Sequence, residues 1–166
     1  MRSRGLALLL IALFVVPPSG AFAEPPPALA RLGSLVGHWE TRPQTGGPIR
    51  VSYRFVAGDS ALVQTFVTPS GKETLTIFHA DGPRVVATHY CGQGNQPRLR
   101  LDPASTPGRL IFVFVDATNL ATPAASHLIR LELRLDGAGT YTQIETYETA
   151  GQAETSTLTL HRIKAR

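Results

Sequence analysis

Apolar and polar residues alternate along most of the chain after residue 36. In the run 49–56, aliphatic and aromatic residues from Ile49 to Phe55 occupy every second position, and arginine or serine stands between them. The run 127–135 repeats the pattern, with isoleucine and leucine set against arginine and glutamate. Successive side chains of a strand point to opposite faces of a sheet, so this alternation predicts strands with one buried face and one wet face.

Ten runs rich in β-branched and aromatic residues recur at intervals of about 10 to 12 residues, separated by Gly, Pro, Asp and Asn. They are 37–42, 49–56, 61–68, 73–79, 84–90, 98–102, 109–115, 127–135, 140–146 and 154–164. We expect an all-β domain: a single antiparallel up-and-down barrel of about ten strands, because closure removes exposed sheet edges. A sandwich of two sheets is the alternative fold.

One short helix precedes these runs. Residues 28–36 carry Leu29, Leu32 and Leu35 at helical spacing, and Gly37 ends the segment. The residues before it, 24–27, form a proline-rich leader that favours an extended conformation. We therefore expect the helix to plug one end of the barrel.

The first 23 residues have the pattern of a signal peptide. Two arginines precede the apolar run 5–16, and Ala21-Phe22-Ala23 has the small-x-small form that a signal peptidase recognises. The apolar run is shorter than the roughly 20 residues that a permanent membrane helix needs. The sequence thus predicts a secreted or periplasmic protein that starts near Glu24, with the barrel domain at 28–166 and no stable membrane insertion.

Charge and cysteine content restrict the partners. Without the first 23 residues, 14 basic residues face 12 acidic ones, and no run of lysine or arginine remains. This composition gives no support to nucleic-acid binding. A single cysteine, Cys91, cannot form an internal disulfide, so it is buried, functional or paired with another chain.

Two features resemble a known family. Gly37-His38-Trp39 opens the first strand after a short helix, as the Gly-x-Trp sequence does in lipocalin-type (calycin) barrels, and Arg162 resembles the arginine that covers that tryptophan. The resemblance implies a structural role for Trp39 and Arg162 at a closed end, and a cavity for a small, mostly apolar molecule. Ten strands instead of eight, and no disulfide, depart from the family. Nitrobindin-like barrels, which have ten strands and bind haem, are the nearest alternative.

Strand order places the candidate chemistry at two ends. If Trp39 opens the first strand at the closed end and strand directions alternate, the tenth strand returns Arg162 to Trp39. The same alternation brings the loops 91–97 and 116–126 to the open end, and His38, His79 and His161 to the closed end. We expect His79 and His89 to lie too far apart to share a site.

The densest group of reactive side chains is 88–98, Thr-His-Tyr-Cys-Gly-Gln-Gly-Asn-Gln-Pro-Arg. It resembles a stretch of secreted bacterial proteins to which no activity is assigned. We predict that the mouth of the barrel binds the ligand through His89, Cys91, Asn95, Arg98, Asn119 and His127. Arg98 could instead pair with Asp116 across the mouth.

Several interpretations of His89 and Cys91 remain open. They could pack as a hydrogen-bonded imidazole beside a small apolar thiol, or form a Cys–His nucleophile. Together with His127 they could bind zinc, and any one of the three could ligate haem. Whether they point inward depends on the turn near Gly82. We favour a bulged-glycine turn, which puts Leu75 and Ile77 on the same face as His89, over a two-residue turn, which exchanges the faces.

The function expected from these patterns is non-enzymatic binding of a small, mostly apolar molecule, without a cofactor. The first alternative is a haem or metal protein with redox chemistry at the mouth, and the second is an envelope protein whose loops bind a macromolecule. No pair of catalytic carboxylates is evident, and we expect Glu145 and Glu148 to be solvated.

Overall fold

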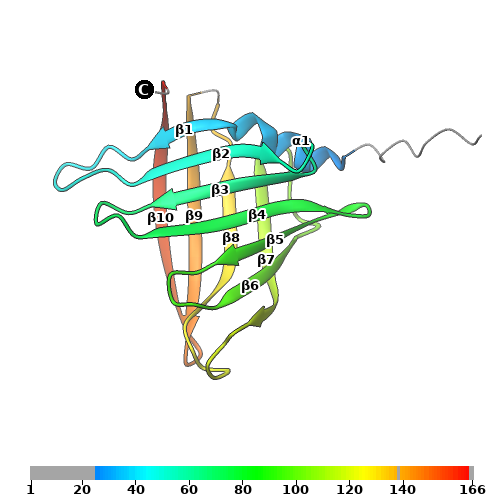
Figure 1. Cartoon of the computed structure of the whole chain (residues 1–166), viewed down its shortest axis with the longest axis vertical. Helices are drawn as coiled ribbons and strands as arrows, with labels where there is room; N and C mark the ends of the chain where they lie inside the picture. Colours follow the sequence, from blue (N-terminus) through cyan, green and yellow to red (C-terminus); the bar gives the residue numbers. More distant parts are fainter. Residues whose placement is uncertain (1–24, 138, 165–166) are drawn as a thin grey trace, which may run out of the picture.

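A computed structural model describes residues 25–137 and 139–164 of the chain. Within these ranges ten antiparallel strands close into one up-and-down barrel, and a short helix lies at one end (Figure 1). The predicted fold class is confirmed. The predicted signal peptide, residues 1–23, lies outside the described residues.

Each strand pairs with its neighbours in the chain, and the first strand pairs with the last. The strands are β1 (Gly37–Glu40), β2 (Arg50–Val56), β3 (Ala61–Val67), β4 (Glu73–Asp81), β5 (Arg84–Tyr90), β6 (Gln96–Leu101), β7 (Arg109–Thr118), β8 (His127–Arg134), β9 (Thr140–Thr149) and β10 (Gln152–Ile163). Every one of the ten expected runs is a strand. At the open end, β6, β7, β9 and β10 extend two or three residues further into the loops than the sequence indicates.

The helical segment divides into an α-helix, α1 (Pro27–Leu32), and a 3₁₀ turn, η1 (Gly33–Leu35). Pro27 suits the first position of the helix because a backbone N–H at that position would have no hydrogen-bond acceptor within the helix. Leu29, Leu32 and Leu35 are buried against the barrel. No helix in the described part of the chain is long and apolar enough to cross a membrane.

Trp39 and Arg162 close this end of the barrel. Trp39 is 1% exposed, and its indole N–H donates to the Leu35 carbonyl at 2.7 Å. The Arg162 guanidinium lies 4.1 Å from the centre of the indole ring. Its two terminal nitrogens donate to the carbonyls of Val36 and Ser34 at 2.8 and 2.7 Å. The predicted pairing of Trp39 with Arg162 is confirmed, and it also ties η1 to the last strand.

The half of the barrel next to this end is filled with side chains. The largest fully buried ones there are Trp39, Tyr53, Tyr141, Phe78, Phe112, Leu32, Leu62, Leu99, Leu133 and Leu160. The fully buried Leu131 and Leu128 lie further along β8, opposite Glu145 and Tyr147. Tyr141 packs edge-on against Trp39, with ring centres 4.8 Å apart, and Phe78 packs against Phe112 at 5.2 Å. Any ligand must therefore enter from the opposite, open end.

The turn between β4 and β5 differs from the expected one. Asp81 pairs with Arg84, so only Gly82 and Pro83 form the loop, and Gly82 takes the positive φ of 59° that a two-residue hairpin requires. The expectation of a bulged-glycine turn was wrong. The observed register places Phe78 opposite Ala87 inside the barrel, and it leaves Leu75 and Ile77 on the outer face.

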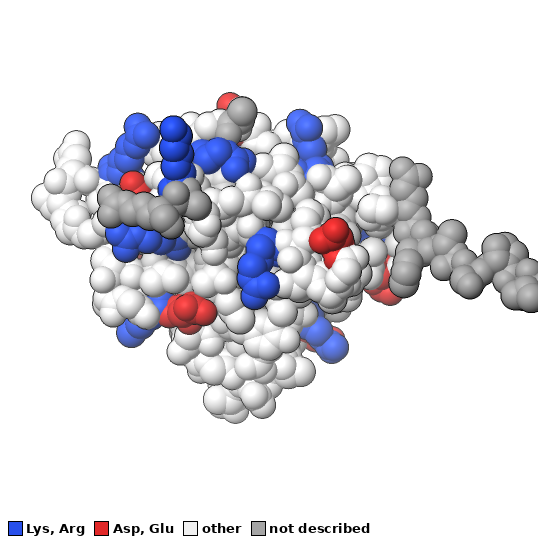
Figure 2. All heavy atoms as spheres, turned by 45° about the horizontal axis from the view of Figure 1, so that its top comes forward, with Lys and Arg blue, Asp and Glu red and all other residues white. Residues whose placement is uncertain are grey.

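The barrel is less completely paired toward the open end. β1 pairs with β10 only over His38–Glu40, so the part of β10 from Gln152 to Leu160 pairs with β9 alone. β7 and β8 pair only as far as Val113 and Arg130. On the face shown in Figure 2, basic and acidic side chains lie interspersed at several separate places.

Candidate functional site

The inward face of β9 carries a row of polar side chains that runs from the closed end to the mouth. In that order they are Tyr141, Gln143, Glu145 and Tyr147, opposite Leu160, Leu158, Ser156 and Glu154 of β10. Side chains alternate along a strand, so the threonines and Ile144 between them face outward. The interior therefore changes from apolar to polar along one strand.

The deep part of this row forms a closed hydrogen-bond network. The Gln64 side-chain amide donates to the Tyr53 hydroxyl at 2.6 Å and to the Gln143 side-chain oxygen at 2.7 Å. Tyr53 and Tyr141 hydroxyls lie 3.2 Å apart. Burial raises the pKa of Tyr53 above its ordinary value. These phenols stay protonated and bonded to each other, so we assign them a structural role.

Glu145 stands where the network meets the mouth. The Gln143 amide donates to Glu145 Oε1 at 2.8 Å, and burial raises the pKa of the Glu145 carboxyl. The expectation that Glu145 is solvated was wrong, because the residue is half-buried and its side chain faces the interior of the barrel. Both faces of β9 are largely polar, so the alternation did not reveal which one is inside.

His89 faces into the barrel at the same level. It is 3% exposed, with Nδ1 3.0 Å from the Thr76 hydroxyl and Nε2 3.2 Å from the Tyr147 hydroxyl. Burial lowers the pKa of His89 to about 4. The imidazole is therefore neutral near pH 7, and one of its nitrogens donates while the other accepts.

Cys91 lies beside Tyr147. The pKa of Tyr147 is raised first by burial, then by Glu145 and by the hydrogen-bonded Cys91 thiol. Cys91 is half-buried and carries no disulfide. Both ring nitrogens of His89 already bond to Thr76 and Tyr147, so His89 is not placed as a base for Cys91. The geometry favours the packing interpretation of this pair over the nucleophile.

Asn95 fastens the loop after Cys91 to the long loop before β8. Its side-chain amide donates to the Ser126 carbonyl at 2.9 Å, and the Gln93 amide donates to the Ser126 hydroxyl at 3.2 Å. Asn95 is 4% exposed, and its Oδ1 is buried without a hydrogen-bond partner in the described structure. This loop is held in place and still has an unsatisfied acceptor.

His127 packs into the gap where β7 and β8 separate. It is 5% exposed, its Nδ1 lies 2.8 Å from the Ala125 carbonyl, and its ring contacts Phe114 with centres 4.8 Å apart. The structure therefore places His127 at the open end, as expected, but in a packed position beside the mouth.

Two of the predicted site residues lie on the outside. Arg98 forms a two-pronged ion pair with Asp116, at 2.5 and 2.6 Å, on the outer face of β6 and β7. The two residues pair as the sequence suggested, but on neighbouring strands of the outer face and not across the mouth. Asn119 is exposed and takes a positive φ of 54°, which reverses the chain after β7. The structure thus brings His89 and Cys91 together around Tyr147 and leaves Arg98 and Asn119 apart from them.

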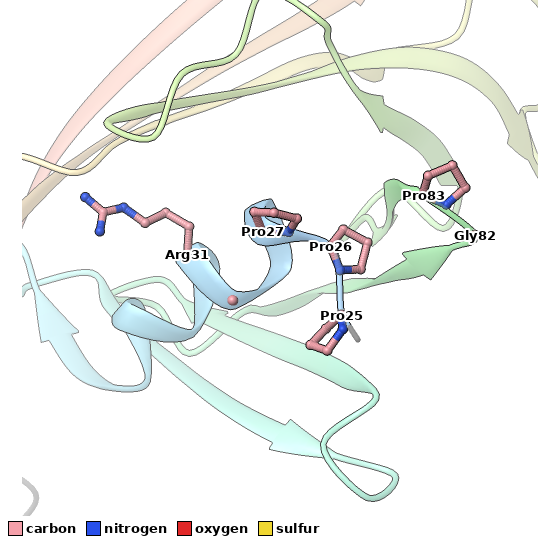
Figure 3. A pocket seen from close by; sticks show the side chains of 7 residues that line it. Pro25, Pro26, Pro27, Arg31, Gly82 and Pro83 are labelled. Atoms are coloured by element: carbon pink, nitrogen blue, oxygen red, sulfur yellow. The ribbon is translucent and has the colours of Figure 1, made fainter. Parts of the chain in front are cut away.

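A pocket of about 280 Å³ opens over Tyr147. Its lining residues are Gln93, Ser126, Tyr147, Glu154 and Ser156, all of which carry a polar group. A larger groove of about 910 Å³ lies at the closed end, among the prolines 25–27, Gly82 and Pro83. Figure 3 shows that the Arg31 side chain there extends away from those prolines, and it donates to the Pro107 carbonyl. The polar pocket at the mouth is the candidate site.

The mouth does not form the suggested zinc site, and neither of its two histidines is placed as a haem ligand. Across the described ranges, no group of three or more His, Cys, Asp or Glu side chains could hold a metal ion, so His89, Cys91 and His127 do not form the suggested zinc site. A haem ligand would need a free imidazole nitrogen facing an open cavity. His89 has both nitrogens bonded, and the ring of His127 is packed against Phe114.

Sequence reasoning missed Tyr147 and Glu145. The one available signal was the strict alternation of β9 with β10 across a short turn, which sets Tyr141 and Gln143 opposite Leu160 and Leu158. Extending that register by two steps would have placed Glu145 and Tyr147 inside.

Comparison with known proteins adds no family. No protein-family model matches the chain, and no curated protein matches it. What the structure itself establishes is a closed antiparallel barrel of ten strands, an architecture that is consistent with a lipocalin-like fold.

Proposed function

We propose that this protein binds a small molecule at the open end of its barrel and does not transform it. One observation carries the proposal: the pocket is lined by Tyr147, whose hydroxyl contacts the inward-facing His89 and which follows the inward-facing Glu145 on β9. Barrel mouths are common positions for ligand sites, which combine an enclosed shape with a few convergent polar groups.

The packing of the barrel limits the size of the ligand. The closed half is filled by aromatic and leucine side chains, so the ligand occupies the mouth alone. A pocket of about 280 Å³ is slightly smaller than the range of about 300–1,000 Å³ that small-molecule sites usually span, so the ligand is small. The lipocalin resemblance implies a mostly apolar ligand. The lining residues favour one that also offers hydrogen bonds.

The same proposal extends to family and location. Trp39 under Arg162, next to a helix at the closed end, supports a relationship to the calycin-type barrels. The signal-like pattern of the first 23 residues supports a secreted or periplasmic carrier. Binding is favoured over catalysis because His89 is engaged by Thr76 and Tyr147 and activates no nucleophile.

Mass spectrometry of the protein purified from its native source, under non-denaturing conditions, tests the proposal. We expect a co-purified small molecule in the wild type and in Tyr90→Phe, because Tyr90 is an exposed tyrosine of β5. Tyr147→Phe should lose most of that ligand. A native protein without any bound molecule, or equal retention by both variants, would contradict the proposal.

A further inference from the structure

We infer that the pocket over Tyr147 selects small organic cations, above all protonated amines, with Glu145 and Glu154 as the opposing charges. The inference rests on the proposed binding function and names its ligand class.

The register of β9 and β10 places Glu154 in the pocket and Glu145 beside it, next to two of the lining residues. Glu154 lines the pocket and pairs directly with Tyr147, which also lines it. Ser156, the next inward residue of β10, lines the pocket and pairs with Glu145. Glu145 and Glu154 are therefore diagonal neighbours, which lie about 7–8 Å apart in an antiparallel pair. A small ligand bound against Tyr147 therefore lies beside the Glu154 carboxyl, and the Glu145 carboxyl lies next to the lining residues Tyr147 and Ser156.

Neither carboxyl has a cationic partner among the described residues. The ion pairs found there involve Asp81, Asp116 and Glu132, all on the outer side of the barrel. In the described strands, Arg162 is the sole lysine or arginine at an inward position, and it covers Trp39 at the far end. The mouth therefore has two carboxyl groups without a cationic partner, and because burial raises the pKa of Glu145, a bound cation would favour its ionised form.

Glu132 shows how the same fold treats a buried carboxylate that has no ligand to bind. Its side chain is 3% exposed and is surrounded by Arg109, Arg130 and Arg134 at 2.6 to 3.0 Å. Three guanidinium groups thus form ion pairs with one carboxylate on the outer face. Glu145, on the inner face of the adjacent strand, receives only the neutral Gln143 amide. The contrast indicates that the Glu145 carboxyl, which faces the mouth, has its cationic partner in a ligand from outside the chain.

Unused hydrogen-bond capacity points to the same ligand class. Gln143 occupies one oxygen of Glu145, and no described residue donates to the other. Asn95 Oδ1 is also a buried acceptor without a donor, on a side chain bonded to the pocket residue Ser126. The mouth thus has acceptors in excess. An ammonium group supplies three donors and no acceptor, and it is attracted to an aromatic face such as that of Tyr147.

Isothermal titration of the whole protein with three probes of equal chain length tests the ligand class. The probes are hexylamine, which is protonated at pH 7.5, the neutral hexanol and the anionic hexanoate. We expect hexylammonium to bind at least tenfold more tightly than hexanol, and hexanoate to bind most weakly. Higher salt should narrow the difference between the probes.

Charge-removing variants locate the effect. Glu145→Gln and Glu154→Gln should each reduce the preference for hexylammonium over hexanol several-fold. Glu154 is exposed, so its variant keeps the test valid if Glu145→Gln folds poorly. Glu148→Gln is the matched control, because Glu148 lies on the outward face of the same strand, opposite His127.

Two results would overturn the inference. Hexanol binding as tightly as hexylammonium would refute the cation preference and leave the proposed binding function standing. Binding of none of the three probes would refute it as well, and the co-purification experiment would then decide the proposed function separately.

Discussion

The hydroxyl of Tyr147 and Nε2 of His89 lie 3.2 Å apart, although the two residues are 58 positions apart in the chain and stand on β9 and β5. Thr76 occupies the other ring nitrogen at 3.0 Å. A neutral imidazole satisfies this arrangement with one donor and one acceptor. An imidazolium would have two donors, so one of the two hydroxyl groups would have to turn to accept. The contact therefore links β5 to β9 at the mouth, and its geometry depends on the protonation state of His89.

Acid should weaken the fold through His89. Its pKa is about 4 in the folded protein against an ordinary 6.5, so the unfolded chain takes up the proton at a higher pH. The contribution is complete above pH 6.5 and is lost as the pH falls toward 4, at up to about 1.4 kcal/mol per pH unit and about 3 kcal/mol in total. Urea unfolding at pH 7, 6 and 5 measures it.

The control for this experiment is His89→Gln. The raised pKa of Glu145 acts in the opposite direction, because its proton stabilises the folded state at low pH and is lost as the pH rises through that pKa. The variant keeps Glu145, so the difference in stability between wild type and variant isolates His89. That difference should shrink as the pH falls. A difference that is constant from pH 7 to 5 would show that His89 does not titrate as inferred.

Glu132 should produce a second loss of stability at lower pH. The adjacent Arg109, acting with Arg134 and Arg130, lowers the pKa of Glu132 to about 2 from its ordinary 4.5. Its contribution is present above pH 4.5 and disappears as the pH falls toward 2. We expect about 2 kcal/mol, because the arginines are partly exposed and solvent screens them. Glu132→Gln should remove this dependence in thermal unfolding curves between pH 5 and 2.5.

The buried side-chain amide of Gln64 should contribute strongly to the free energy of unfolding. Gln64→Leu leaves the Tyr53 hydroxyl and the Gln143 oxygen without their donor in a dry interior. We expect a loss of about 2–4 kcal/mol in the free energy of unfolding. Gln93→Leu provides the comparison at an exposed position, with an expected change below about 0.5 kcal/mol. Equal effects of the two substitutions would show that the inner network contributes little.

Arg162 should stabilise the closed end. Arg162→Met removes the guanidinium from the indole of Trp39 and from the carbonyls of Ser34 and Val36. We expect a loss of about 2–3 kcal/mol, measured by urea unfolding. Arg100→Met, at an exposed arginine of β6, should stay within about 0.5 kcal/mol of wild type. An Arg162→Met variant as stable as wild type would mean that the other contacts of the helical segment, its buried leucines and the Trp39–Leu35 hydrogen bond, are sufficient to hold it.

The sequence predicts the fold well because its signals are local. Each strand is short and bounded by turn residues, and the even number of strands is enough to return Arg162 to Trp39. The face assignments were harder. A one-residue change in the turn at Gly82 exchanges the faces of β4, and the favoured register was the wrong one.

The candidate site was predicted less completely, because its contacts join distant strands. Gln64 and Gln143 are 79 residues apart, and nothing in either segment indicates the other. Composition directed attention to Cys91 and Arg98, which look reactive. Tyr147 and Glu145 stand in a run whose two faces are both polar, so their inward position depends on the register of the whole barrel.

The three residue pairs that join β1 to β10 have a consequence for how the protein is made. They connect β1 to β10, so they cannot form until the ribosome has released β10. Before that moment, β1 to β9 can form only a curved open sheet with both edges unprotected. Long-range pairing of this kind is slow to form. Closure of the barrel is thus a late step of folding. A chain that lacks β10 would have nine of the ten strands, but the barrel and the mouth that β10 completes would not form.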